Sequence, residues 1–309
     1  MDDIGKWRKL MRDVRNGTKI NKLQLPKKKS LELVDGDGNN VLMVAAQNGH
    51  YELVIFFIGK VKIKEENTIG NNALMLAAKN GHTDVVELLI RHKGNVKASN
   101  RHGNNALMLA AMNGHLEAVI LLIKKVNIQE TNKNKNNALM LAAEKGHIDI
   151  VELLINHKGN VRATNNNGNN ALMLAAENGH GNLVEFLCEI KIGVRAVNNN
   201  KQNALMLAAK NGHTAVVKLL IRHKVGIKAT DCNGNNALML AAINGDLETV
   251  KRLNKLVDVK QQNSDGNNAV MIASEGGSEL IIKLLIRRVD LTVANKQGKD
   301  ALMIAAENN

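Results

Sequence analysis

Histidine recurs through the sequence at a spacing that invites a metal-binding interpretation. One series, in which every member follows a glycine, is His50, His82, His115, His147, His180 and His213. Zinc ligands must converge to about 2 Å from one ion, whereas packed helices lie about 8–10 Å apart. If these histidines belong to successive helices, one per helix cannot meet that distance. The series therefore favours a structural role over a metal site.

The other groups that could act as nucleophiles or bases form no catalytic set. Cys188 and Cys232 lie far apart, form no pair motif and have no convincing base beside them. A second histidine series, each followed by Lys, is typical of solvated helix ends: His92, His157 and His223. The glycines recur at regular spacing rather than in a phosphate-binding loop. We therefore expect no enzyme, no catalytic residue, no metal and no cofactor, and unpaired cysteines favour a reducing, cytoplasmic compartment.

The elements that position these residues are repeats. The stretch NNALMLAAKNGH, residues 71–82, returns almost unchanged in copies that start at positions 39, 71, 104, 136, 169, 202, 235, 267 and 299. Each step is 32 or 33 residues long. Such a period is typical of a solenoid, in which one unit is too small to bury its own apolar face and its neighbours cover it.

Local signals within a unit predict two short helices and a projecting loop. Asn72 is a good N-cap for a first helix, which Asn80 and Gly81 should end. A second helix is expected over residues 84–93, with its Val and Leu side chains on one side. Residues 94–103 should then return the chain through a turn-rich link.

The unit resembles the ankyrin repeat, whose pattern is roughly D-x-x-G-x-T-P-L-H-x-A-A-x-x-G-H-x-x-V-V-x-x-L-L. Residues 100–115, NRHGNNALMLAAMNGH, carry the match. The resemblance implies an all-α fold, an ankyrin-repeat solenoid of stacked helix-turn-helix units with projecting β-turn loops. The sequence departs from the pattern regularly, with Asn for Thr, Ala for Pro and Met for His. We expect the Asn to keep the helix cap and the Met to make an apolar contact between repeats.

The two ends are less regular than the middle. Residues 39–309 are expected to form the array, with nine units of which the last is only a half-repeat. Residues 1–38 are expected to be a degenerate N-terminal capping repeat, in which Trp7, Leu10 and Val14 cover the first full unit. The closing ALMIAAENN either ends the stack as a half-unit or leads into a longer natural protein. The second is favoured because solenoid ends need a polar outer face, and monomer or end-to-end self-association both stay open.

The charge balance points to an anionic partner or to a solvated, lysine-rich surface. Net charge is +13. A basic track is expected beside the loops: Lys97, Arg162, Arg195, Lys228 and Lys260. Aromatic residues are only 2% of the sequence, so the stacking platforms of a nucleic-acid reader are missing. An acidic protein surface is therefore favoured over nucleic acid, and no transmembrane segment is expected.

Functional information should lie where the units differ. One variable track consists of pairs at the loop tips, and the other is the first-helix position after the double Ala. The resemblance implies that both tracks face a concave groove where partners bind. The candidate partner-binding residues are Lys79, Arg101, His102, Met112, Lys133, Glu144, Glu177, Lys210 and Ile243. Met112 and Ile243 are candidate anchors because their counterparts are mostly polar, although isolated exposed apolar side chains are also common without any function.

The favoured function is a protein–protein interaction scaffold or adaptor, which binds a partner with acidic patches through the concave groove and the loop tips. One alternative is a targeting module of a larger enzyme or bacterial effector, delivered into a host cytosol. The other is an electrostatic binder of nucleic acid or an anionic membrane surface, which a steep salt dependence would reveal. The close likeness of the units also leaves natural and consensus-engineered repeats open.

Overall fold

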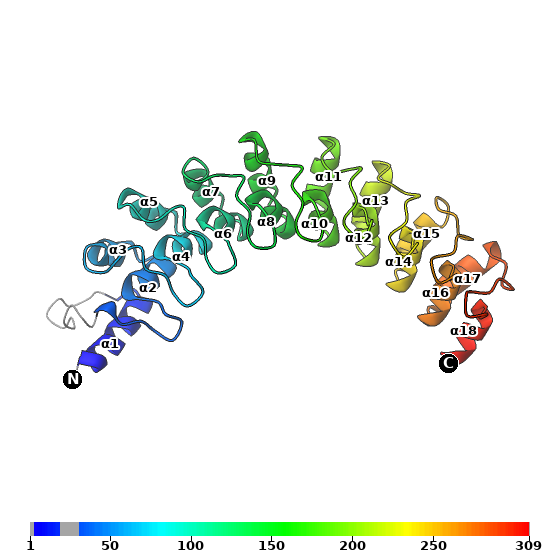
Figure 1. The fold of residues 1–309 in the computed structure, drawn as a ribbon, viewed down its shortest axis with the longest axis horizontal. Helices are drawn as coiled ribbons and strands as arrows, with labels where there is room; N and C mark the ends of the chain where they lie inside the picture. Colours follow the sequence, from blue (N-terminus) through cyan, green and yellow to red (C-terminus); the bar gives the residue numbers. More distant parts are fainter. Residues whose placement is uncertain (1–2, 19–30, 309) are drawn as a thin grey trace. The chain divides into compact units, whose positions relative to one another are not determined.

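The computed structural model describes residues 3–18 and 31–308 and consists of two compact units, residues 1–160 and residues 161–309. We call these the N-terminal unit and the C-terminal unit (Figure 1). Over the described ranges the regular structure is helical, and β pairing is limited to two isolated bridges, Ser99–Asn105 and Thr230–Asn236. The expected all-α repeat architecture is confirmed.

The N-terminal unit stacks its helices in two rows. First helices contact first helices, second helices contact second helices, and the opening helix contacts the first helix of the first repeat. The first helices are α2 (Val41–Gln47), α4 (Ala73–Lys79), α6 (Ala106–Met112) and α8 (Ala138–Lys145). The second helices are α3 (Tyr51–Ile58), α5 (Thr83–Arg91), α7 (Leu116–Leu122) and α9 (Ile148–Asn156), and the opening helix is α1 (Asp3–Arg15).

The C-terminal unit repeats this two-row arrangement. Its first helices are α10 (Ala171–Glu177), α12 (Ala204–Lys210), α14 (Ala237–Ile243), α16 (Ala269–Glu275) and α18 (Ala301–Glu307). Its second helices are α11 (Gly181–Glu189), α13 (Thr214–Arg222), α15 (Leu247–Leu253) and α17 (Glu279–Leu285), the last followed by the short 3₁₀ helix η3 (Ile286–Arg288).

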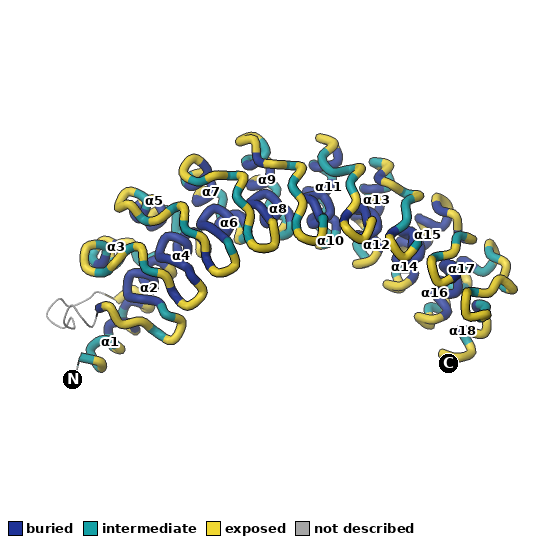
Figure 2. The backbone as a smooth tube through the Cα atoms, in the orientation of Figure 1, coloured by how far each residue is buried: buried dark blue, intermediate teal, exposed yellow. Residues whose placement is uncertain are grey.

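The core consists of the first helices, which are dark blue in Figure 2 where the loops are yellow, together with the buried side chains of the second helices, such as Val85, Val86 and Leu89 of α5. In α4 all six residues from Ala73 to Ala78 are buried, because neighbours cover the helix on every side but its end. Met75 is 1% exposed, as expected for an apolar contact between repeats. In α18 the equivalent Leu302 and Met303 are 60% and 53% exposed, since α16 packs against one side of that helix.

The helix ends follow the local sequence signals with one difference. Asn72 caps α4 by accepting the Met75 N–H at 2.9 Å, and Gly81 beyond its end takes a φ of +76°. The second helix was expected to run to residue 93, but α5 ends at Arg91. Lys93 adopts a φ of +61°, and the Gly94 N–H bonds back to the Leu89 carbonyl at 2.8 Å, which closes the helix early.

Candidate functional site

Four members of the glycine–histidine series hold the end of the preceding first helix. His115 donates from Nε2–H to the Lys79 carbonyl oxygen at 2.9 Å, although it lies 36 residues further on. Its ring also covers Gly81, where a Cβ atom would lie 2.4 Å from Nδ1. His82 and His147 in the N-terminal unit and His213 in the C-terminal unit make the same type of bond. These carbonyls belong to the variable first-helix positions, and those bonded to His115, His147 and His213 belong to the candidate binding residues Lys79, Met112 and Glu177.

The ring nitrogens of these histidines therefore bond to backbone carbonyl oxygens, which is the structural role that the sequence predicted for the series. Over the described ranges, no group of three or more His, Cys, Asp and Glu side chains is placed to hold a metal ion. Cys188 is buried, and burial raises the pKa of its thiol to about 11, partly offset by the charge of Arg222. That thiol is protonated at neutral pH and is a poor nucleophile.

The loop tips form a hydrogen-bonded row within each unit. Arg101 donates its backbone N–H to the Ile69 carbonyl at 2.9 Å, and Lys133 donates to His102 at 3.0 Å. In the C-terminal unit the same bond joins Cys232 to Asn200 at 2.9 Å. Sequence reasoning predicted projecting loops but not this row. A glycine that directly follows most of the tip pairs, such as Gly70 and Gly103, was its only signal.

Beneath the tips, a ladder of asparagine side chains joins successive repeats. In each rung the Nδ2 of a loop Asn donates to the Oδ1 of an Asn in the preceding repeat. The rungs are Asn67–Asn39, Asn100–Asn71 and Asn132–Asn104 in the N-terminal unit, and Asn198–Asn169, Asn263–Asn235 and Asn295–Asn267 in the C-terminal unit, all at 2.8–2.9 Å. The ankyrin pattern often has Asp at this loop position, and a carboxylate cannot donate such a bond. The Asn in its place contributes a hydrogen-bond donor between repeats.

Two loops carry Asp in place of the donor Asn of the ladder, and the two Asp side chains have different hydrogen-bonding partners. Asp35 forms an ion pair with Arg15 of α1 at 2.8 Å. A side chain of α1 thus supplies the hydrogen-bond donor at this end of the ladder. Asp231 accepts the N–H groups of Asn233 and Asn235 within its own loop. In the preceding repeat the facing position holds Gln202 in place of Asn.

In the N-terminal unit, the candidate residues occupy two kinds of position. The first-helix candidates lie at the C-terminal ends of α4, α6 and α8, where Lys79 is exposed and Met112 and Glu144 are half-buried. Glu144 forms an ion pair with Lys145 at 3.1 Å. The loop-tip candidates Arg101, His102 and Lys133 are all exposed.

In the C-terminal unit, the two tracks meet. Glu177 and Lys210 line a cavity of about 350 Å³ together with the loop-tip residues Asn199 and Asn200. Ile243 is not among the lining residues, but its side chain is 58% exposed at the end of α14.

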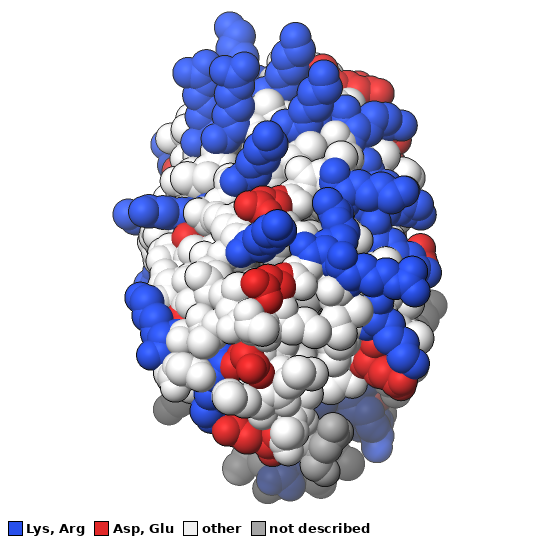
Figure 3. Space-filling model, turned by 90° about the vertical axis from the view of Figure 1, so that its right-hand side faces the viewer, with Lys and Arg blue, Asp and Glu red and all other residues white. Residues whose placement is uncertain are grey.

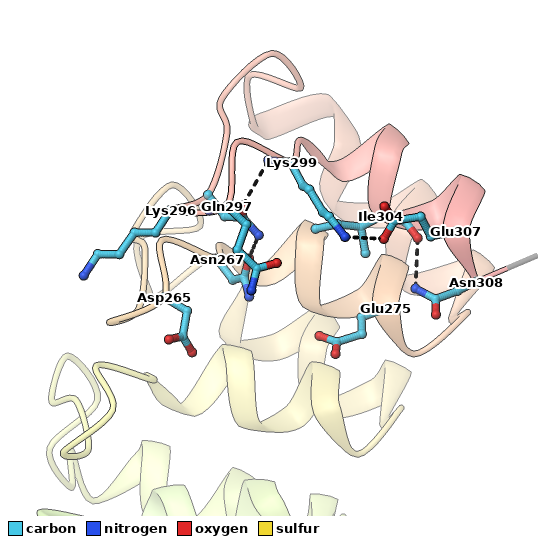
Figure 4. Close-up of a pocket in the computed structure, with 10 residues that line it drawn as sticks. Asp265, Asn267, Glu275, Lys296, Gln297, Lys299, Ile304, Glu307 and Asn308 are labelled. Atoms are coloured by element: carbon cyan, nitrogen blue, oxygen red, sulfur yellow. Dashed lines mark hydrogen bonds and ion pairs between the residues drawn. The ribbon is translucent and has the colours of Figure 1, made fainter.

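The same arrangement recurs between α16 and α18, in a cavity of about 420 Å³. Here the loop-tip residues Lys296 and Gln297 share the cavity with Glu275 of α16 and Glu307 of α18. Figure 4 shows Lys299 reaching from the loop toward Glu307, to which it bonds at 2.6 Å. Loop tips and first-helix ends therefore line a common cavity at two places in this unit.

The surface charge is uneven. Figure 3, which faces the right-hand side of Figure 1, shows Lys and Arg gathered along the upper and right-hand margins, with fewer and scattered Asp and Glu. Of the candidate residues, those in the N-terminal unit are mostly basic, whereas Glu177 and Lys210 in the C-terminal unit are of opposite sign.

Comparison with known families supports the architecture over nearly the whole chain. The family model of ankyrin repeats (3 copies) matches residues 10–100, 42–132, 107–198, 190–260 and 238–309. A comparison with curated proteins found no match. In the described part of the chain, no helix is both long and apolar enough to cross a membrane. Ankyrin repeats are generally protein-interaction modules and are typically non-catalytic. With matches that together run from residue 10 to residue 309, the chain belongs to the ankyrin repeat family.

Proposed function

We propose that this chain is a protein-interaction scaffold or adaptor, and that its partner binds to the loop tips and the first-helix ends. The observation that carries the proposal is that residues of both variable tracks line a common cavity at two places in the C-terminal unit, between α10 and α12 and between α16 and α18. Variable side chains gathered around a common space are what a specific binding surface needs, since specificity comes from differences between positions.

The framework beneath these side chains is held in place before any partner arrives. The histidine bonds fix the first-helix ends, the backbone row fixes the tips, and the asparagine ladder joins one loop to the next. A preorganised surface loses little conformational entropy on binding, so more of the contact energy appears as affinity.

The chemistry of the candidate residues favours a partner with acidic patches. Lys79, Arg101 and Lys133 are exposed cations on the two tracks of the N-terminal unit. Ile243, at 58% exposed, and the half-buried Met112 are apolar at positions where most repeats carry a charged or polar residue, and we propose them as anchors. Side chains that dominate binding lie in desolvated pockets near the centre of an interface, and a bound partner would bury these two apolar side chains in that way.

We also propose that residues 1–38 cap the array that residues 39–309 form. Leu10, Met11 and Val14 of α1 are buried, and α1 contacts α2. The Arg15–Asp35 ion pair supplies the contact that a preceding loop would otherwise make. Residues 19–30 of the proposed cap lie outside the described residues.

The proposal is tested by capture from a cell lysate at low and high salt, with a matched control. Ile243→Glu changes the proposed groove, and Ile120→Glu makes the same change at a 47% exposed position on the second helix α7. We expect one defined protein to be retained at high salt by the wild type and by Ile120→Glu, and lost from Ile243→Glu. Met112→Glu should behave like Ile243→Glu.

Two outcomes would contradict the proposal. Equal losses in Ile243→Glu and Ile120→Glu would place the partner elsewhere on the surface. Recovery of nucleic acid alone, released by salt from all variants alike, would show a purely electrostatic binder, because phosphate contacts weaken steeply with salt concentration.

A further inference from the structure

A third cavity, of about 460 Å³, lies in the C-terminal unit at the ends of the second helices α11 and α13. It shares no lining residue with the two cavities described above. Its wall comes from the last residues of these helices and from the return loops that follow them, so it is separate from the proposed partner-binding tracks.

The cavity includes a loop position at which some repeats carry a carboxylate and others carry Ala. In the N-terminal unit, Glu65 and Glu130 occupy this loop position and accept hydrogen bonds from the N-cap Asn of a first helix at 3.0 and 2.8 Å. Here the position is Ala229, which lines the cavity. The N-cap amide of Asn203 bonds instead to the Gly226 carbonyl at 3.0 Å. The carboxylate that Glu65 and Glu130 place at this position is therefore absent from the cavity wall.

The lining is positively charged. Lys191, Arg195 and Lys224 contribute to it, and no Asp or Glu does. A bound anion would therefore be attracted by up to three cations and repelled by no carboxylate of this wall. Arg adds a planar pair of N–H donors that matches the geometry of a phosphate.

His223 adds an unsatisfied polar atom to the same wall. The second histidine series was expected to mark solvated helix ends, and His92 and His157 are indeed exposed. His223 departs from that expectation, since its Nε2 is buried and has no hydrogen-bond partner among the described residues. A buried ring nitrogen without a partner costs free energy, and a ligand oxygen would satisfy it.

We propose that this cavity binds a phosphate group carried by a small organic molecule. Lys191, Arg195 and Lys224 neutralise the phosphate, which carries about −1.5 to −2 charges at neutral pH, and His223 donates from Nε2–H to one of its oxygens. Val194 and Val197, also in the lining, contact the organic part. This site is independent of the partner-binding groove, and neither proposal depends on the other.

The test titrates the full chain with phenyl phosphate, and follows binding by calorimetry and the His223 ring resonances by NMR. Ala229→Glu introduces the residue that two loops of the N-terminal unit carry as Glu65 and Glu130, and Ala98→Glu makes the same change at the matching position of another loop of that unit. We expect Ala229→Glu to weaken binding by about tenfold or more, Ala98→Glu to leave it unchanged, and the His223 resonances to shift in the wild type.

A second pair of variants separates a built site from general surface charge. Lys191→Gln/Arg195→Gln removes two cavity cations, and Lys93→Gln/Lys97→Gln removes the equivalent two in the N-terminal unit. Only the first pair should weaken binding, and circular dichroism confirms that each variant is folded. Equal weakening by both pairs, unchanged affinity in Ala229→Glu, or a His223 signal that does not move would each overturn the proposal.

Phosphatidylcholine vesicles with and without a phosphoinositide identify the source of the phosphate. Vesicle binding that requires the phosphoinositide and is lost in Ala229→Glu would support the site with a lipid headgroup as its ligand. Binding of phenyl phosphate without vesicle binding would support it with a soluble phosphate ester.

Discussion

Asn100 donates from its side-chain Nδ2 to the Oδ1 of Asn71 at 2.9 Å, across the boundary between two repeats, and both residues are buried. The Oδ1 of Asn100 meanwhile accepts the backbone N–H groups of His102 and Asn104 in its own loop. One side chain therefore shapes a loop and ties it to the preceding one. The repetition of this pair explains how nearly identical units build a firm row of loop tips.

The ladder predicts strong coupling between two mild substitutions. In Asn71→Asp and in Asn100→Asp, one side-chain amide remains to donate to one carboxylate. Each single substitution should therefore change the free energy of unfolding only slightly. The double variant places two carboxylates in contact, and we expect it to lose about 1–3 kcal/mol more than the sum of the single variants at neutral pH. Urea denaturation of all four proteins measures this coupling, and simple additivity would show that the Asn100–Asn71 bond contributes little.

The histidine contact predicts that two similar glycines differ in their tolerance of a methyl group. Gly81 and Gly245 both have a φ near +75°, but a Cβ at Gly81 would lie 2.4 Å from His115, whereas Gly245 has only the Ser278 Oγ at 3.8 Å. Gly245→Ala should cost about 1–2 kcal/mol for the left-handed backbone. Gly81→Ala should cost about 1–3 kcal/mol more, because the ring must move.

Thermal and urea unfolding of both glycine variants check this difference. Equal destabilisation would mean that the histidine ring gives way freely and does not hold the end of α4.

Much of the fold was predictable from the sequence, because the signals repeat. The caps at Asn72 and Gly81 and the burial of Met75 follow from local propensity and periodicity, which each copy restates. The early end of α5 was missed, because a left-handed Lys93 is a rare conformation that its residue type does not announce. The buried Nε2 of His223 was also missed, since it depends on which side chains are absent nearby.

The sequence predicted which residues belong to the candidate site, but not how these residues lie together on the surface. Sequence variation picked out Glu177 and Lys210 one by one, but only the structure shows them around one cavity with Asn199. The backbone bond that links Arg101 to Ile69 joins residues 32 positions apart. No side-chain pattern encodes such a bond directly.

Asp246 predicts a pH-dependent contribution to stability. Burial raises the pKa of this carboxyl, but hydrogen bonds from Thr249 and Thr214 outweigh it and hold the pKa below its ordinary value. A lowered folded-state pKa means that the stabilisation is present above the unfolded-state pKa of about 3.9 and is lost as the pH falls through the folded-state value.

Asp246→Ala should therefore destabilise the protein by about 0.5–2 kcal/mol at neutral pH, through the lost cap of α15. The gap between wild type and variant should shrink below about pH 4. Urea midpoints measured across this range provide the check. A gap that stays constant with pH would contradict the assigned hydrogen bonds.

The two cysteines should differ sharply in reactivity. Cys232 is exposed, whereas Cys188 is buried with a pKa raised to about 11. Iodoacetamide at neutral pH should modify Cys232 in the folded protein and Cys188 only after unfolding, since the thiolate is the reactive form. Peptide mass spectrometry over time distinguishes the two, and comparable rates would show that the wall around Cys188 opens readily.

The most direct test of the account is site-specific photocrosslinking to the captured partner. A photoreactive phenylalanine analogue is placed at position 112 or 243 on the first helices, or at position 120 on α7 as the control. We predict that the partner crosslinks to positions 112 and 243 and not to position 120. Crosslinking at position 120 with none at positions 112 and 243 would show that the partner does not use the groove.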